Sequence, residues 1–99
     1  MDNMAVWFKQ GVIGFEKLTD PTRRGFNAVG NLFAGKGKDL FVTAIAEGNH
    51  CPGSLHYFYR AFDFRKNGII LKELKAVLGK NFDVIEHSTH FHVEYDPKG

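Results

Sequence analysis

The chain has 99 residues, of which 43% are hydrophobic and 24% are charged. This balance is typical of an ordinary soluble globular domain, and it excludes fibrous, collagenous and disordered proteins. The only cysteine, Cys51, excludes a disulfide bond within the chain. Because so short a chain buries only a small core, a bound metal ion is one way in which the fold could gain stability.

The charge and hydropathy patterns argue against nucleic-acid binding and against membrane insertion. The net charge is only +2, and the 13 Lys and Arg residues are spread along the chain without a run of five. No apolar stretch approaches the roughly 18 residues of a membrane span. The first residues do not form the apolar core of a signal peptide, so we expect the protein to be cytoplasmic on synthesis.

The first predicted element is a helix that begins at Asp20-Pro21 and ends at Gly35. Asp20 is the expected N-cap, and Pro21 suits the first helical position because that position needs no N–H donor. An apolar stripe follows at three- and four-residue spacing: Phe26, Val29, Leu32 and Phe33. The stripe predicts that this helix packs against the core.

Two strands and a second helix are predicted next. Residues 41–46 are β-branched and aromatic enough for a buried strand, and residues 61–64 predict a shorter one. Apolar residues over 69–78 then fall on one face of a helix, which Gly79 is expected to end.

The last third of the chain predicts a hairpin with strands over 82–86 and 90–95. Period-2 alternation places His90, His92 and Glu94 on one face of the second strand. Together with the earlier elements, the hairpin predicts an α+β fold with a small antiparallel sheet and flanking helices. No repeat or linker divides the sequence, so we expect the whole chain to be one domain.

All five histidines lie in the second half of the chain, at positions 50, 56, 87, 90 and 92. A zinc enzyme needs three nitrogen or oxygen ligands, one open position for water, and a nearby carboxylate that moves protons. Candidate ligands are His56, Asp63 and a histidine of the last strand, and Glu86 is the leading candidate for the base. Ligands from two separate segments leave no short diagnostic motif, so the spacing alone is moderate evidence.

Two blocks of sequence resemble the signatures of a family of zinc peptidases. The blocks are Ser54-Leu55-His56-Tyr57-Phe58-Tyr59-Arg60-Ala61-Phe62-Asp63 and Glu86-His87-Ser88-Thr89-His90-Phe91-His92-Val93-Glu94. The first is similar to Ser-x-His-x-x-Gly-x-Ala-x-Asp, and the second to an acid followed by a strand with His-x-His. Both signatures belong to the D-alanyl-D-alanine carboxypeptidase and L-alanyl-D-glutamate endopeptidase family, which cleaves peptidoglycan. The signalling domain of hedgehog proteins shares that fold and has similar blocks.

The resemblance implies a hedgehog-like zinc fold with its metal-site blocks within residues 41–97. It also implies that His56, Asp63 and His92 hold Zn²⁺, and that Glu86 is the general base that takes a proton from water. One residue departs from the signature, since Tyr59 stands where the family has Gly. If that position needs a positive φ angle, Tyr costs energy there or bends the loop.

Three further residues each have two interpretations. His90 shares a face with His92, and we expect it to orient a ligand or to contact substrate and not to bind the metal itself. His50 either stabilises the oxyanion or is an ordinary turn histidine. Arg60 either binds a substrate carboxylate or is a solvated loop arginine.

Three more candidates have a simpler leading interpretation. Cys51 is an alternative ligand, although an isolated cysteine is more often a small buried hydrophobe. Glu94 competes with Glu86 for the acid/base role, and Glu86 is preferred because it matches the family spacing. His87 is expected to be exposed in the hairpin turn.

These observations predict a zinc peptidase that cleaves the peptide stem of peptidoglycan, similar to small phage endolysins. A chain without a signal would then reach the cell wall through a membrane pore made by another protein. The chief alternative is a binding module with the same zinc site and no turnover, which Tyr59 motivates. A third hypothesis is a small domain without a metal.

Overall fold

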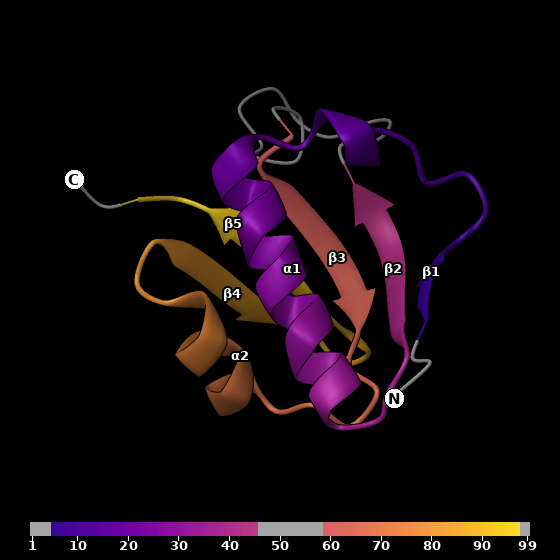
Figure 1. Ribbon diagram of the computed structural model, residues 1–99, viewed down its shortest axis with the longest axis vertical. Coiled ribbons are helices and arrows are strands. Elements are labelled where there is room, and N and C mark those ends of the chain that lie inside the picture. Colours follow the sequence, from indigo (N-terminus) through magenta and orange to yellow (C-terminus); the bar gives the residue numbers. More distant parts are fainter. Residues whose placement is uncertain (1–4, 46–58, 98–99) are drawn as a thin grey trace.

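Figure 1 shows a computed structural model of the protein, which describes residues 5–45 and 59–97. Within these residues, five strands form one sheet and two α-helices lie across one of its faces. The elements in chain order are β1 (Val6–Phe8), a short 3₁₀ helix η1 (Phe15–Lys17), α1 (Asp20–Gly35), β2 (Leu40–Ile45), β3 (Ala61–Arg65), α2 (Leu71–Leu78), β4 (Phe82–Glu86) and β5 (His90–Tyr95). The predicted α+β class is confirmed at this level. No helix among the described residues is both long and apolar enough to cross a bilayer.

The sheet has the strand order β1-β2-β3-β5-β4 and is mixed. The predicted antiparallel arrangement is found for β2, β3, β5 and β4. β1 is the exception, because it pairs with β2 in parallel and α1 connects the two strands. A parallel pair needs a crossover of this kind, and the sequence pattern did not predict β1.

α1 begins at Asp20, so its N-cap is Thr19 and not the predicted Asp20. The Thr19 backbone oxygen accepts the N–H of Arg23 at 2.8 Å, and the Thr19 and Thr22 hydroxyls are hydrogen-bonded at 2.7 Å. Three residues of the predicted stripe are buried and the fourth packs at the edge of the core: Phe26, Val29 and Phe33, then Leu32. The helix ends at Gly35, as predicted.

α2 is two residues shorter at its start than the predicted 69–78. The N–H of Ile70 donates to Glu73 Oε1 at 3.2 Å, which satisfies one of the free donors at the beginning of the helix. Gly79 ends the helix with a φ of 82°. An ion pair between Lys36 and Glu73 joins the end of α1 to α2. The hydrogen bond from Lys36, supported by that from Ile70, lowers the pKa of the Glu73 carboxyl.

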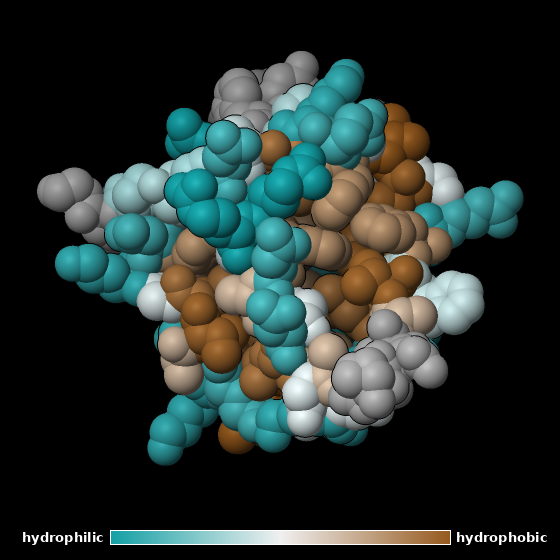
Figure 2. Space-filling view, viewed as in Figure 1, coloured by the Kyte–Doolittle hydropathy of each residue, from teal (hydrophilic) through white to brown (hydrophobic). Residues whose placement is uncertain are grey.

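Phenylalanine rings fill the core between the helices and the sheet. Phe26 and Phe33 of α1 meet Phe62 and Phe64 of β3 edge to face, with ring centroids 5.1 and 5.7 Å apart. Such ring pairs add about 0.5–1.5 kcal/mol each beyond their burial. Phe91 of β5 packs on Phe64 at 5.8 Å. Figure 2 shows the outside of this helical side, where polar side chains follow α1 and hydrophobic ones gather on either side of it.

Candidate metal centre

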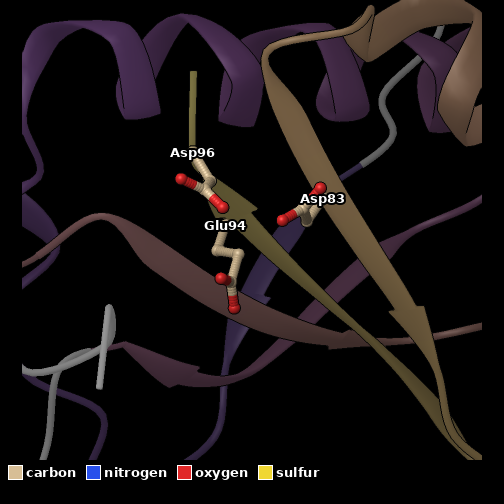
Figure 3. A group of neighbouring side chains, drawn as sticks. All are labelled: Asp83, Glu94 and Asp96. Atoms are coloured by element: carbon tan, nitrogen blue, oxygen red, sulfur yellow. The ribbon is translucent and has the colours of Figure 1, made fainter. Parts of the chain in front are cut away.

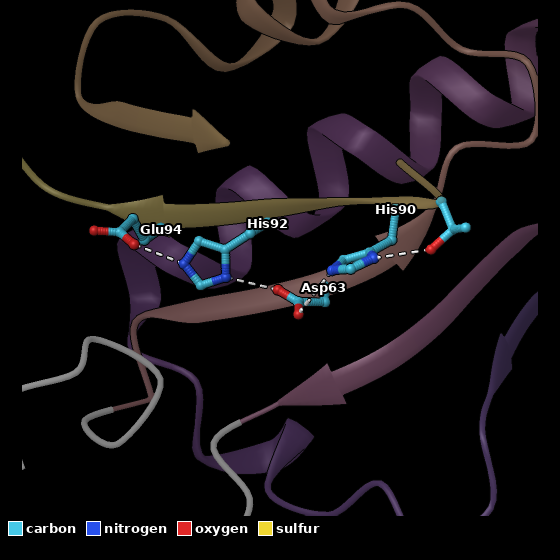
Figure 4. A network of polar contacts seen from close by, with 5 residues as sticks. Asp63, His90, His92 and Glu94 are labelled. Carbon is cyan, nitrogen blue, oxygen red and sulfur yellow. Dashed lines mark hydrogen bonds and ion pairs between the residues drawn. The ribbon is translucent and has the colours of Figure 1, made fainter. Parts of the chain in front are cut away.

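The polar residues of the central strands lie on the sheet face that α1 and α2 leave uncovered. β3 and β5 are antiparallel neighbours, and their register pairs Asp63 with His92. Side chains alternate along a strand, so burying Phe62 and Phe64 against the helices directs Asp63 to the opposite face. His92 and Glu94 share that face, as predicted for the last strand. Figure 4 shows the resulting row of side chains along β5 and β3.

His92 is the centre of this row and contacts an acid with each ring nitrogen. Its Nδ1 lies 2.7 Å from Asp63 Oδ1, and its Nε2 lies 2.6 Å from Glu94 Oε1. The side chains are mostly shielded from solvent, with exposed fractions of 13% for His92, 17% for Asp63 and 19% for Glu94. The partly buried surroundings strengthen these contacts relative to contacts in water.

The pKa of His92 is raised above its ordinary value. Burial of the ring disfavours the charged form and acts to lower the pKa. The hydrogen bonds and negative charges of Asp63 and Glu94 outweigh burial and raise it. Without a metal ion the ring therefore holds its second proton readily, and an ion that binds at Nδ1 displaces that proton.

His90 lies on the other side of Asp63. Its Nε2 is 3.8 Å from Asp63 Oδ2, and its Nδ1 is 3.2 Å from the hydroxyl of Thr89. The His90 ring also stacks on that of His87, with centroids 4.5 Å apart. Asp63 thus stands between two histidines of β5, His92 and His90 (Figure 4). The expected role of His90, to orient a ligand or to contact substrate, stays a prediction.

Three carboxylates gather at the end of the same row. Oxygen atoms of Asp83, Glu94 and Asp96 lie within 4.8 Å of one another, and such a group could hold a cation (Figure 3). Sequence reasoning missed Asp83 and Asp96. The hairpin register, which pairs Asp83 with Glu94, is the signal that could have found them. Exposed acidic groups are common without an ion, so this triad indicates no particular metal.

Glu86 lies on the other face of the sheet from His92. In the β4–β5 register Glu86 pairs with the buried Phe91, whereas the residue opposite His92 is Ile85. Its Oε2 forms an ion pair with Lys66 Nζ at 2.9 Å, and the side chain is 44% exposed. The structure therefore does not bring Glu86 to Asp63 and His92, and Glu94 is the glutamate that lies beside them.

The other sequence candidates lie in or beside the segment that leads into β3. Arg60 is exposed directly before that strand, and its backbone oxygen accepts the N–H of Tyr95 at 2.8 Å. Tyr59 has a φ of 60°, so the position that the family signature fills with Gly does adopt the left-handed conformation. His50, Cys51 and His56 lie outside the described residues.

Comparison with known proteins assigns no family to the chain. No family model matches it, and no curated protein or solved structure does either. The resemblance to zinc peptidases therefore stays a prediction from the two sequence blocks. The approach of Asp63 to His92 is an observation that does not depend on that resemblance.

Proposed function

We propose that the protein is a zinc-dependent peptidase that acts on the peptide stem of peptidoglycan, with Asp63 and His92 as two of its metal ligands. The observation that carries the proposal is the 2.7 Å approach of His92 Nδ1 to Asp63 Oδ1 across two neighbouring strands. These are the two residues of the described chain that the resemblance names as ligands.

The chemistry of this donor pair fits zinc. Histidine nitrogen and carboxylate oxygen both bind Zn²⁺ at about 2.0–2.2 Å, so two ligand atoms of a tetrahedral site lie about 3.4 Å apart. The two atoms are now at hydrogen-bond distance, 2.7 Å, so they would have to separate by about 0.7 Å to hold one ion. His56, outside the described residues, is proposed as the third ligand on the strength of the resemblance alone.

Glu94 supports the proposal from the far side of the ring. A metal-binding histidine almost always donates its other N–H to a carboxylate or a carbonyl, which fixes the tautomer and the ring orientation. The Nε2–H of His92 donates to Glu94 Oε1 at 2.6 Å in this way, and the Nδ1–H of the protonated ring donates to Asp63 Oδ1 at 2.7 Å. Loss of the Nδ1 proton would free that nitrogen for a metal ion and keep the bond to Glu94.

The proposed division of labour follows from these positions. Zinc, when bound, supplies Lewis acidity that lowers the pKa of water and polarises a scissile carbonyl. Glu94 contacts Nε2, across the ring from Nδ1, so it lies too far from an ion at Nδ1 to take a proton from its water, and its proposed role is to orient the His92 ring. His90 holds Asp63 from its second side.

Two matched substitutions test this proposal on purified cell-wall sacculi. Glu94→Gln is expected to lower zinc affinity and the release of new amino groups by about 10- to 100-fold, because an amide orients the His92 ring less firmly than a carboxylate does. Glu86→Gln makes the same change on the opposite face and should leave hydrolysis within about twofold. Loss of activity in Glu86→Gln alone would restore the role that the resemblance gives to Glu86. Masses of the released fragments would tell carboxypeptidase from endopeptidase action.

The second candidate is a binding module with the same zinc site and no turnover. The φ of 60° at Tyr59 favours it, because a strained residue beside the ligand strand could displace the catalytic geometry. Stoichiometric zinc without any hydrolysis, in the wild-type protein and in Tyr59→Gly, would support the module. Recovery of hydrolysis in Tyr59→Gly would instead assign the loss to that one residue.

To act on peptidoglycan, the protein must also cross the cell membrane. As part of the same proposal, the protein crosses the membrane through a pore made by another phage protein, as the likeness to small endolysins suggests. Expression in bacteria with and without a pore-forming protein tests this, since lysis should need both.

A further inference from the structure

The sheet face opposite α1 and α2 has a second feature, a pocket of about 540 Å³. It lies at the end of β3 that is farther from the acidic triad. Its lining includes Trp7 of β1, Phe41 of β2 and Arg65 of β3, together with Asp39, Asn67 and Thr89. Two aromatic walls and a cation on three adjacent strands form a site that could take an organic anion.

The aromatic wall is held in place although it is open to solvent. Trp7 is 53% exposed and lies beside Phe41 in the β1–β2 register. Its indole N–H donates to Asp39 Oδ2 at 3.3 Å, while Asp39 Oδ1 accepts the N–H of Ala5 at 3.0 Å. The carboxylate of Asp39 is thus occupied in positioning the wall.

Two cations line the pocket, Arg65 and Lys66, and Arg65 is the one without an acidic partner among the described residues. Its guanidinium carbon lies 4.6 Å from the centroid of the Phe41 ring, an arrangement that fixes the guanidinium over an aromatic surface. Among the described residues Arg65 forms no ion pair, whereas its neighbour Lys66 is paired with Glu86. A fixed guanidinium without an acidic partner is suited to two parallel hydrogen bonds to a carboxylate.

The pocket is continuous with the proposed metal centre. Arg65 follows Asp63 by two residues on the same face of β3, a separation of roughly 7 Å along the strand. In the β3–β5 register Arg65 pairs with His90, and Thr89 both lines the pocket and contacts His90. A peptide held at Asp63 and His92 would reach Arg65 with a group about two residues away.

We propose that this pocket binds a carboxylate of the peptide substrate, with Arg65 as the anion-binding residue and Trp7 and Phe41 as the apolar walls. The inference rests on the proposed function, because it takes the ligand to be a peptide that also reaches Asp63. It adds a specificity rule: substrates with a free carboxylate about two residues from the cleaved bond are bound more tightly than their amides.

Trp7 is the only tryptophan of the chain, so its fluorescence reports directly on the pocket. The probes are an acetylated trialanine that ends in a carboxylate and the same peptide ending in an amide, both N-methylated at the peptide bonds to resist hydrolysis. The wild-type protein is expected to bind the acid at least tenfold more tightly than the amide. Arg65→Gln should bind both probes equally and weakly.

Arg24→Gln is the matched control, because it removes the same charge from an exposed arginine of α1 and should keep the discrimination. Equal binding of acid and amide by the wild-type protein would overturn the proposal. This test uses the wild-type protein alone, so it does not depend on whether a variant folds. Discrimination that survives in Arg65→Gln would also overturn it. Inorganic phosphate that displaces the acid at equal concentration would show a generic anion site and count against a peptide pocket.

Failure of this inference can be told apart from failure of the proposed function. If Arg65→Gln hydrolyses sacculi with an unchanged KM, the proposed carboxylate pocket is wrong and the proposed peptidase function stands. If the wild-type protein binds the acid through Arg65 but never hydrolyses sacculi, the proposed peptidase function is wrong and the proposed anion pocket stands.

Discussion

Tyr59 has a backbone conformation that suits glycine, and it stands two residues before the strand that carries Asp63. A side chain in the left-handed region costs roughly 1–2 kcal/mol. The contacts that hold Tyr59 there are modest: its backbone oxygen accepts the N–H of Thr19 at 3.2 Å, and Lys17 Nζ lies 5.7 Å from its ring centroid. The residue therefore stores strain beside the candidate site.

Relief of that strain can be measured. Tyr59→Gly should have a higher free energy of unfolding than Tyr59→Ala by about 1 kcal/mol, because both variants lose the ring contact and only Ala keeps the strain at positive φ. Urea denaturation of both variants provides the comparison. An alanine variant as stable as the glycine variant would mean that position 59 is not held at positive φ in solution.

The candidate site was predictable in part. Alternation along the last strand correctly places His92 and Glu94 on one face. The same rule applied to 82–86 places Glu86 with Phe82 and Val84 on the core side, which disagrees with the role that the family spacing gives to Glu86. The approach of Asp63 to His92 could not be predicted, because it depends on the register between strands that are 29 residues apart.

At the scale of elements, α1 packs on β4 through a close contact that only glycine permits. A Cβ at Gly25 would lie 2.4 Å from Phe82 Cζ, whereas a Cβ at Gly30 would meet nothing within 4 Å. Phe82 is itself held against Tyr95, with ring centroids 5.3 Å apart. Gly25 is therefore required by packing against Phe82, whereas Gly30, in the same helix, is not required by any contact.

We expect Gly30→Ala to stabilise the protein by about 0.5–1 kcal/mol through helix propensity. Gly25→Ala has the same propensity gain but must displace the Phe82 ring, so it should destabilise the protein by about 1–3 kcal/mol. Thermal and urea unfolding measure both effects. If the packing explanation is right, Phe82→Leu should recover part of the loss in Gly25→Ala; two equally stable alanine variants would contradict it.

The ion pair between Lys36 and Glu73 makes the contact between α1 and α2 dependent on pH. A pKa that is lowered in the folded state stabilises the protein above the unfolded value, near 4.5, and this contribution is lost as the pH falls through the folded pKa. Glu73→Gln should thus lower the unfolding free energy at pH 7, and this effect should shrink as the pH falls below about 4.5. Urea unfolding at several pH values measures it, and an effect that does not change with pH would contradict the role of the ion pair.

Most elements were predictable because their signals are local. The capped helix, the apolar periodicity of α2 and the alternating hairpin need only neighbouring residues to be recognised. β1 was missed because it has three residues, all exposed, and its pairing partner begins 32 residues later. A strand of this length exists only through its neighbour in the sheet.

At the scale of the whole molecule, a metal ion on β3 and β5 would bind the folded state only. Zinc at a concentration of 100 times its dissociation constant raises the free energy of unfolding by about 2.7 kcal/mol. In a domain of this size, that increase raises the melting temperature by roughly 10–20 °C. Asp63→Asn should lose this shift, and Asp83→Asn should keep it. Calorimetry with zinc and with chelator measures both variants. The reverse result would show that the ion binds at the acidic triad and not at Asp63 and His92.

β1 and β4 are the two edge strands of the sheet, and β1 is the shorter, with three exposed residues, so it is the strand that local unfolding should release first. The amide of Lys9, bonded to Val42 at 2.9 Å, should then exchange its hydrogen with solvent sooner than the amides of β3. Because Trp7 of this strand is a wall of the pocket, each local opening also dismantles the pocket. An occupied pocket should slow exchange throughout β1, which couples ligand binding to the order of the amino-terminal strand.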